Sequence, residues 1–188
     1  MTRETSFQKE AVTTEIRLAS PADLDAVAGL YLHNHASTYR ELLPEYVSGL
    51  SLPYCREKWA AFLNAPENRV WTAWESGALL GFAACAIDAE LPETWYLEAL
   101  HVADRARGKG VGTALIRAAA AYAAARGYRR MSVCIIRGNE RAGGLYRKLG
   151  AAHFKYFEDD FHGTKTRSEK LLWETLPEGK EKGEETHV

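Results

Sequence analysis

The stretch Leu100-His101-Val102-Ala103-Asp104-Arg105-Ala106-Arg107-Gly108-Lys109-Gly110-Val111-Gly112 joins an apolar, strand-like run to an alanine-rich helical segment. Its glycines leave the backbone amides of the turn unblocked by side chains. Free amides at a helix start, reinforced by the helix dipole, suit a pyrophosphate group, and Arg107 and Lys109 add positive charge. The stretch therefore predicts a strand, a phosphate-binding turn and a helix in succession. The alternative is a tight helix entry that binds nothing.

The spacing of the glycines separates this turn from two other phosphate-binding loops. A GxxxxGK[ST] loop is absent, and the spacing is not the GxGxxG of a Rossmann dinucleotide site. Arg107-x-x-Gly110-x-Gly112 instead resembles the R/Q-x-x-G-x-G/A signature of GNAT superfamily acetyltransferases. A second segment, Asn139-x-x-Ala142-x-x-x-Tyr146 followed by Gly150, resembles that family's N-x-x-A-x-x-x-Y-x-x-x-G segment. The resemblance is at motif level from Leu100 to Ala151 and looser from Ile16 to Trp173.

Strand and helix signals alternate on both sides of the turn. Strands are predicted at Glu15–Leu18, Val70–Glu75, Leu79–Ile87, Trp95–Val102, Met131–Ile136, His153–Phe157 and Glu169–Trp173. Helices are predicted after Ser20 and over Arg56–Leu63, Gly110–Ala125 and Asn139–Leu149, with Ala36–Leu52 irregular. These signals and the resemblance predict an α+β, GNAT-like fold. We expect a central mixed, mostly antiparallel twisted sheet of about seven strands flanked by about four helices.

The chain length predicts one domain, because 188 residues bury a single substantial core. We expect this N-acetyltransferase-like domain to cover residues 13–176. Residues 1–12 and 177–188 have too little apolar surface to offset their ordering entropy and are predicted to be polar tails.

The composition excludes several classes of partner. Lysine plus arginine (24) nearly balance aspartate plus glutamate (25), so the net charge of −1 gives no broad field for nucleic acid or an anionic membrane. No apolar run approaches the roughly 18 residues that span a bilayer, and no signal-like segment follows Met1. The odd set Cys55, Cys85 and Cys134 lacks CxxC spacing and is interpreted as buried thiols in a reducing cytoplasm. A small-molecule partner is expected, and a homodimer is left open.

The resemblance also implies how the cosubstrate, acetyl-CoA, would bind. In this family the strand before the turn splays from its neighbour, and its main chain pairs with the pantetheine arm. No metal is expected. The residues implied to bind the cosubstrate are Leu100, Val102, Arg107, Gly108, Lys109, Gly110, Val111, Gly112, Thr113 and Asn139.

Catalysis of direct amine attack on a thioester needs a proton removed from nitrogen and a proton delivered to the thiolate. The resemblance offers Tyr146 as the donor, and packing of its ring is the alternative. Glu98 is the candidate base, acting directly or through water, although a strand glutamate can equally pair with an arginine. His101 is a second candidate because the ordinary histidine pKa is about 6.5, but a lone histidine on a strand is often structural. The family often uses ordered water in this role.

The predicted function is transfer of an acetyl group from acetyl-CoA to a primary amine, foremost of a small molecule, in a ternary complex. Two alternatives stay open: a protein or peptide acceptor (an N-terminal or lysine amine), and a non-catalytic acetyl-CoA-binding module. Residues 36–46 are similar to a stretch in many GNAT members, including some that acetylate polyamines. A cationic amine would suit a pocket of aromatic and acidic side chains, namely Tyr31, Tyr39, Tyr46, Trp59, Glu41 and Glu45, which equally fit ordinary packing and solvated charge.

Overall fold

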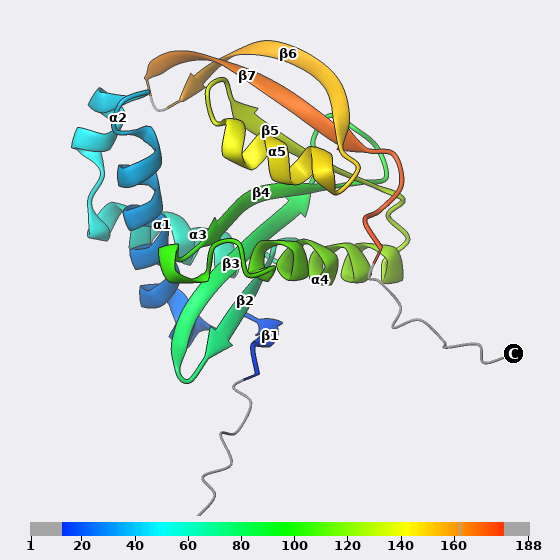
Figure 1. The fold of residues 1–188 in the computed structure, drawn as a ribbon, viewed down its shortest axis with the longest axis horizontal. Coiled ribbons are helices and arrows are strands. Elements are labelled where there is room, and N and C mark those ends of the chain that lie inside the picture. Colours follow the sequence, from blue (N-terminus) through cyan, green and yellow to red (C-terminus); the bar gives the residue numbers. More distant parts are fainter. Residues whose placement is uncertain (1–12, 162, 179–188) are drawn as a thin grey trace, which may run out of the picture.

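Seven strands of the computed structural model form one sheet in the order β1-β2-β3-β4-β5-β7-β6 (Figure 1). The strands are β1 Glu15–Leu18, β2 Arg69–Glu75, β3 Ala78–Ile87, β4 Thr94–Val102, β5 Arg130–Ile136, β6 Ala152–Phe161 and β7 Thr164–Trp173. The structure describes residues 13–161 and 163–178. The predicted tail 1–12, and the predicted tail 177–188 from residue 179 on, lie outside the described residues.

The described residues form five α-helices where about four were predicted. They are α1 Leu24–Tyr39, α2 Pro44–Gly49, α3 Leu52–Asn64, α4 Val111–Ala125 and α5 Glu140–Lys148, with short 3-10 turns at Pro21–Asp23 and Asp104–Ala106. The prediction that Ala36–Leu52 is irregular was wrong. Pro44 opens α2 rather than breaking a helix, because a proline in the first turn lacks only an amide that would be unpaired there anyway.

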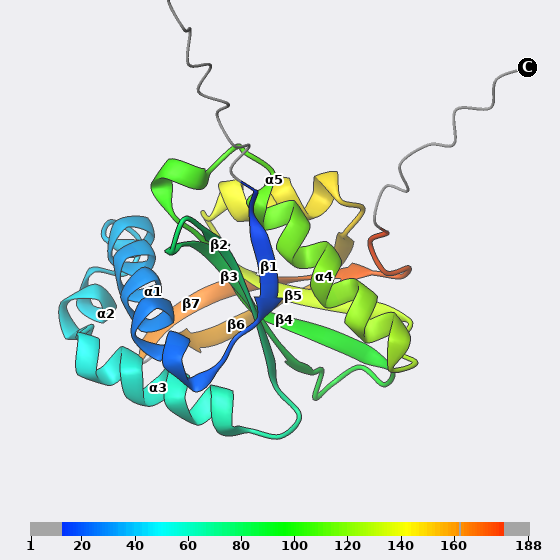
Figure 2. The same cartoon turned by 90° about the horizontal axis from the view of Figure 1, so that it is seen from below.

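The helices cover both faces of the sheet, with α1, α2 and α3 on one side and α4 and α5 on the other (Figure 2). On the first side, Val27, Trp59 and Phe82 are fully buried. On the second, Leu115 and Ile116 of α4 are fully buried, as their positions on one helical face require. The sheet therefore carries a separate apolar cluster on each face.

The last two strands are longer than the sequence predicted. β6 and β7 pair from Ala152↔Leu172 to Phe161↔Thr164 and arch over one end of the molecule in Figure 1. The side chains of residues 158–161 and 163–167 are exposed or half-buried. Most of these residues are polar or charged, so the sequence here lacks the apolar alternation that marks a strand.

The sheet opens between β4 and β5, which are parallel, unlike every other strand pair in the described residues. They pair only from Thr94↔Arg130 to Leu97↔Val133. Beyond that point β4 continues to Val102 and β5 to Ile136 without pairing to each other. The two strands therefore separate at the end where the glycine turn begins.

A β-bulge marks the start of this separation. Cys85 pairs with Leu97 and Ala84 pairs with Ala99, which leaves Glu98 without a partner on β3. Bulges bend a strand and re-aim the extra side chain. Here the bulge places Glu98 at the opening.

No helix in the described ranges is long and apolar enough to cross a membrane.

Candidate active site

A cavity of about 850 Å³ extends through the sheet where β4 and β5 separate. One end is formed by the glycine turn and the first residues of α4 and α5. The other end is formed by side chains of α1 and α3, on the opposite face of the sheet. The cavity therefore connects the two faces of the molecule.

The glycine turn presents unpaired amides to this cavity. Gly108 and Gly110 have φ angles of 75° and 84°, a region that side-chain-bearing residues disfavour. Gly110 precedes α4, and its carbonyl accepts the helix bond from the Ala114 amide at 2.9 Å. The amides of residues 111–113 lie before that bond and have no intrahelical acceptor. Of the predicted turn residues, those that line the cavity are Arg107, Gly108, Gly110, Val111, Gly112 and Thr113. This arrangement fits a diphosphate.

The main chain of β4 faces the opening at two predicted positions. The Ala103 amide donates to the Leu80 carbonyl at 2.8 Å, so odd-numbered residues at this end direct their peptide groups toward β3. Peptide groups alternate along a strand. Those of Leu100 and Val102 therefore point away from β3, toward the gap that opens before β5. Both residues line the cavity.

Arg107 is held by neighbouring elements rather than extended into solvent. Its Nε donates to the Val102 carbonyl at 3.2 Å, its second guanidinium nitrogen donates to Asn34 Oδ1 at 3.2 Å, and it pairs with Asp104. The Asn34 amide also donates to the Val102 carbonyl, at 3.1 Å. Lys109 is exposed and does not line the cavity. The guanidinium of Arg107, which the sequence predicted to add positive charge beside the turn, is thus hydrogen-bonded to residues of α1 and β4.

Tyr146 lies on α5 with its ring packed and its side chain at the cavity. The ring meets Trp173 edge to face, with centroids 5.7 Å apart. Burial, with smaller contributions from Tyr39 and Cys85, raises the pKa of the Tyr146 hydroxyl. The hydroxyl makes no hydrogen bond to another residue in the described part of the chain. It therefore keeps its proton near neutral pH, so the proton is present in the cavity.

Glu98 projects from the bulge into the cavity. Burial raises the pKa of its carboxyl, and Lys58 of α3 opposes that rise. Lys58 Nζ lies 3.9 Å from Glu98 Oε1, and no arginine in the described ranges pairs with this carboxylate. The glutamate thus faces the cavity with a lysine, not an arginine, beside it.

His101 is unsuited to act as a base. Its ring lies among aromatic rings, with centroids 5.2 Å from Tyr31, 5.1 Å from His35 and 5.1 Å from Phe82. Burial, Lys58 and Arg107 together lower the pKa of His101 to about 3. The structure therefore favours the packed-histidine interpretation.

Asn139 links two helices across the cavity. Its Oδ1 accepts from the Ala142 amide at 3.4 Å, which caps α5, and its Nδ2 donates to the Tyr39 hydroxyl of α1 at 3.2 Å. The side chain thus anchors the helix that carries Tyr146. Its contact to the cosubstrate stays a prediction.

Asn139→Ala is expected to lower the free energy of unfolding by about 1 kcal/mol, the usual cost of losing an N-cap. Asn139→Asp is expected to retain most of that stability, because its carboxylate still caps the helix. Urea denaturation followed by circular dichroism measures both values. Equal losses in the two variants would show that the cap does not supply the stability.

The end of the cavity lined by α1 and α3 differs in part from the pocket predicted for a cationic amine. Tyr31, Tyr39 and Trp59 line the cavity, whereas Tyr46 does not. The Tyr46 hydroxyl instead lies 3.1 Å from the Tyr31 hydroxyl and 2.8 Å from His35 Nδ1. The acidic residues of the predicted pocket, Glu41 and Glu45, are exposed and do not line this cavity. The acidic residues that do are Glu98, Glu140 and Asp159.

Further polar side chains line the cavity without having been predicted as site residues. Among them are Asn34, Lys58, Cys134 and Arg141. Asn34 and Lys58 lie in ordinary helical patterns, and Arg141 follows the Asn139 motif position without any signal of its own. The free thiols of Cys55 and Cys85 are buried as predicted, but Cys134 is only half-buried. Within the described residues no group of three or more His, Cys, Asp or Glu side chains is placed to hold a metal ion.

A family model described as the acetyltransferase (GNAT) family matches residues 35–151, more than half of the chain. The chain therefore belongs to the acetyltransferase (GNAT) family. Streptothricin acetyltransferase from Streptomyces lavendulae is 33% identical over 101 residues, which cover 54% of this chain and 53% of that protein. The chain thus spans about half the length of this curated relative.

Solved structures share the fold. PaiA N-acetyltransferase from Thermoplasma acidophilum, solved in complex with coenzyme A, matches with a TM-score of 0.68 and 21% identity, over 84% of this chain and 98% of that chain. Ribosomal-protein-alanine N-acetyltransferase from Brucella melitensis matches with a TM-score of 0.67 and 22% identity, over 85% of this chain and 98% of that chain. At these identities the matches show the fold alone. The predicted family and fold class are confirmed.

Proposed function

We propose that this protein transfers an acetyl group from acetyl-CoA to a primary amine of a small molecule, by direct attack in a ternary complex. The observation that carries the proposal is the cavity through the sheet, with free amides at one end and aromatic and acidic side chains at the other. Two substrates can enter such a cavity from opposite faces and meet where β4 and β5 separate. This geometry suits direct transfer without a covalent enzyme intermediate.

The roles of the side chains follow from their positions in the cavity. Acetyl-CoA supplies an acetyl group already activated as a thioester. Glu98 accepts the proton of the attacking amine, directly or through one water molecule, because it faces the cavity from the bulge. Tyr146 reaches the cavity from the opposite face and delivers its proton to the departing thiolate. The main chain of Leu100 and the amides of the glycine turn hold the cosubstrate.

A small-molecule acceptor is favoured over a protein acceptor by two observations. The curated relative is, by its name, an acetyltransferase of streptothricin, a small molecule. The acceptor end of the cavity also lies among buried aromatic side chains of α1 and α3 rather than on an open surface.

The acceptor class is tested by following release of free thiol from acetyl-CoA with three matched panels. These are small primary amines, peptides with a free N-terminus, and N-terminally blocked peptides that contain lysine. The proposal requires turnover with members of the first panel that exceeds turnover with both peptide panels. Turnover confined to peptides would support the protein-acetyltransferase alternative. Binding of acetyl-CoA without turnover in any panel would support the non-catalytic module.

Acetyl-CoA is expected to raise the melting temperature of the protein. A ligand that binds only the folded state stabilises it by about 2.7 kcal/mol at a concentration 100 times its Kd. For a chain of this size, 1 kcal/mol corresponds to about 2–4 °C, so the expected shift is about 5–10 °C. Differential scanning fluorimetry measures it, with NAD and ATP at equal concentration as controls. Equal shifts with all three ligands would argue against specific binding of acetyl-CoA.

A further inference from the structure

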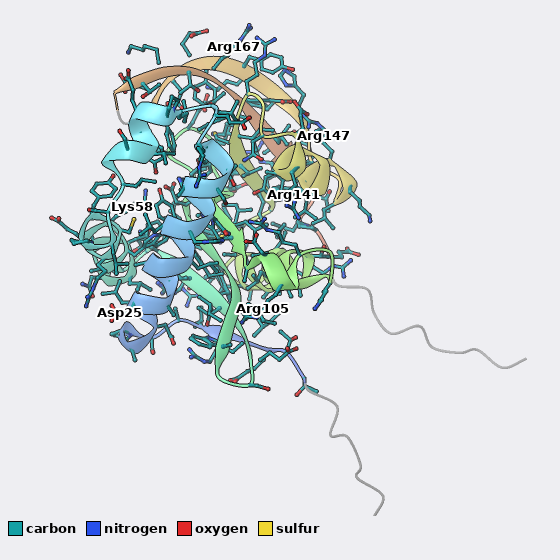
Figure 3. All side chains as sticks on the ribbon, turned by 60° about the vertical axis from the view of Figure 1, so that its left-hand side comes forward. Asp25, Lys58, Arg105, Arg141, Arg147 and Arg167 are labelled. Atoms are coloured by element: carbon teal, nitrogen blue, oxygen red, sulfur yellow. The ribbon has the colours of Figure 1, made fainter. Side chains whose placement is uncertain are left out.

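Lys58 places a positive charge inside the cavity. It belongs to α3, where the neighbouring Trp59 is fully buried against the sheet. The Lys58 side chain is 28% exposed and lines the cavity. In Figure 3 the labelled Lys58 lies on the α3 side of the molecule, whereas Arg141 and Arg147 project from α5. Lys58 is therefore a cation of the acceptor end, not of the glycine turn.

Aromatic rings hold the Lys58 ammonium beside Glu98. Nζ lies 5.5 Å from the Tyr31 ring centroid and 5.9 Å from that of Trp59, within the range of cation–π attraction. Glu98 Oε1 is 3.9 Å away, and no other carboxylate of the described residues lies within ion-pair distance of this ammonium. Lys58 thus has one acidic neighbour, and that neighbour is the carboxyl proposed as the base.

Lys58 is the charged group that opposes the effect of burial on the pKa of Glu98. Several other titratable groups lie around Glu98. Cys85 of β3 and Tyr96 of β4 interact with its carboxyl. One layer further out lie His101 of β4, Tyr31 and His35 of α1, and Cys134 of β5. Burial raises the pKa of Cys85 and Tyr96 and lowers that of His101, so all three are neutral near pH 7. Arg107, the other cation at this strand end, is paired with Asp104.

We propose that Lys58 is a positioning residue for the reaction: its ammonium stabilises the ionised form of the Glu98 carboxyl, so that this carboxyl is ready to accept a proton at neutral pH. An opposite charge within about 4–6 Å favours the charged form of a carboxyl, whereas burial favours the neutral form. Without Lys58, burial acts unopposed. The consequence for catalysis rests on the proposed role of Glu98 as the base.

Lys58→Met tests this role, because methionine keeps the unbranched stem and removes the charge. The ratio of kcat/KM in the variant to that in the wild type is measured from pH 5 to pH 9 with one amine, so that ionisation of the amine cancels. Because the Glu98 pKa rises when the cation is lost, the acidic limb is expected to move up by about one pH unit. The ratio should then approach about one tenth at low pH and return to one at high pH.

Two further variants separate charge from packing. Lys58→Arg keeps a cation that also stacks on aromatic rings, so its pH profile is expected to match the wild type. Lys148→Met removes a lysine that lies outside the cavity and is expected to change nothing. A loss in Lys58→Met that is equal at every pH, or that Lys58→Arg shares, would overturn the inference.

A direct titration distinguishes failure of this inference from failure of the proposed base. The carboxyl carbon of Glu98 is followed by ¹³C NMR in the wild type and in Lys58→Met, with the signal assigned through Glu98→Gln. An unshifted Glu98 pKa in Lys58→Met overturns the role of Lys58. A raised Glu98 pKa with an unchanged pH profile of activity supports the electrostatic effect of Lys58 on Glu98, but shows that Glu98 is not the base and overturns the role of Lys58 in the reaction.

Discussion

Tyr146→Phe is expected to lower kcat at least about tenfold while acetyl-CoA affinity and the melting temperature stay close to those of the wild type. Phenylalanine preserves the edge-to-face contact with Trp173 and removes only the hydroxyl. That hydroxyl has no hydrogen-bond partner among the described residues, so its loss leaves no partner unsatisfied. A general acid contributes typically about 10²–10⁴-fold, and water can replace part of that contribution.

The matched control for this variant is Tyr122→Phe. Tyr122 also packs edge to face against a tryptophan, Trp71, but it lies on α4 and does not line the cavity. Kinetics are measured by titrating acetyl-CoA at a saturating amine concentration, with melting temperatures recorded for both variants. A wild-type kcat in Tyr146→Phe would remove Tyr146 from the mechanism. A loss of affinity with unchanged kcat would assign it a binding role.

Gly110→Val is expected to raise the Kd for acetyl-CoA at least about tenfold. The φ angle of Gly110 is 84°, and a Cβ at this position would meet no protein atom within 4 Å. The added side chain would therefore project into the open space beside the turn, where it would crowd a diphosphate. Valine in this left-handed conformation also costs about 1–2 kcal/mol in stability, which must be separated from the effect on binding.

Gly77→Val supplies that separation. Gly77 has a φ angle of 74°, its Cβ would also meet nothing within 4 Å, and it lies in the β2–β3 turn away from the cavity. Both variants are expected to melt a few degrees below the wild type, but only Gly110→Val should bind acetyl-CoA weakly. Isothermal titration calorimetry measures the two affinities. Equal affinities would place the diphosphate elsewhere.

Local signals in the sequence predicted most of the fold. The glycine turn joins β4 to α4 as the stretch from Leu100 to Gly112 predicted, and Asn139 caps α5 where the motif placed a helix start. These predictions succeeded because turns and caps depend on a few neighbouring residues. The extra helix α2 was missed because proline breaks a helix in its middle but is tolerated in its first turn, where Pro44 lies.

The sequence predicted the site residues that lie in contiguous motifs, but not those that meet only through packing of distant elements. The glycine turn and Tyr146 lie in contiguous motifs. Asn34, by contrast, meets the Val102 carbonyl from 68 positions away in the chain, and Lys58 meets Glu98 only because α3 packs on the same face of the sheet. Such contacts depend on how helices dock, which no local pattern encodes. The roles proposed for Glu98 and Tyr146 stay predictions until the variants are measured.

The two ends of the cavity through the sheet are lined largely by two separate stretches of the sequence. Its acceptor end is built largely by α1 and α3, before residue 65, and its other end by the turn, α4 and α5, after residue 100. If the proposed function holds, substitutions in the first stretch can therefore change which amine is accepted without altering the amides proposed to hold the acetyl donor. Exchanging that stretch between homologues is correspondingly a rational route to chimeric enzymes with altered selectivity.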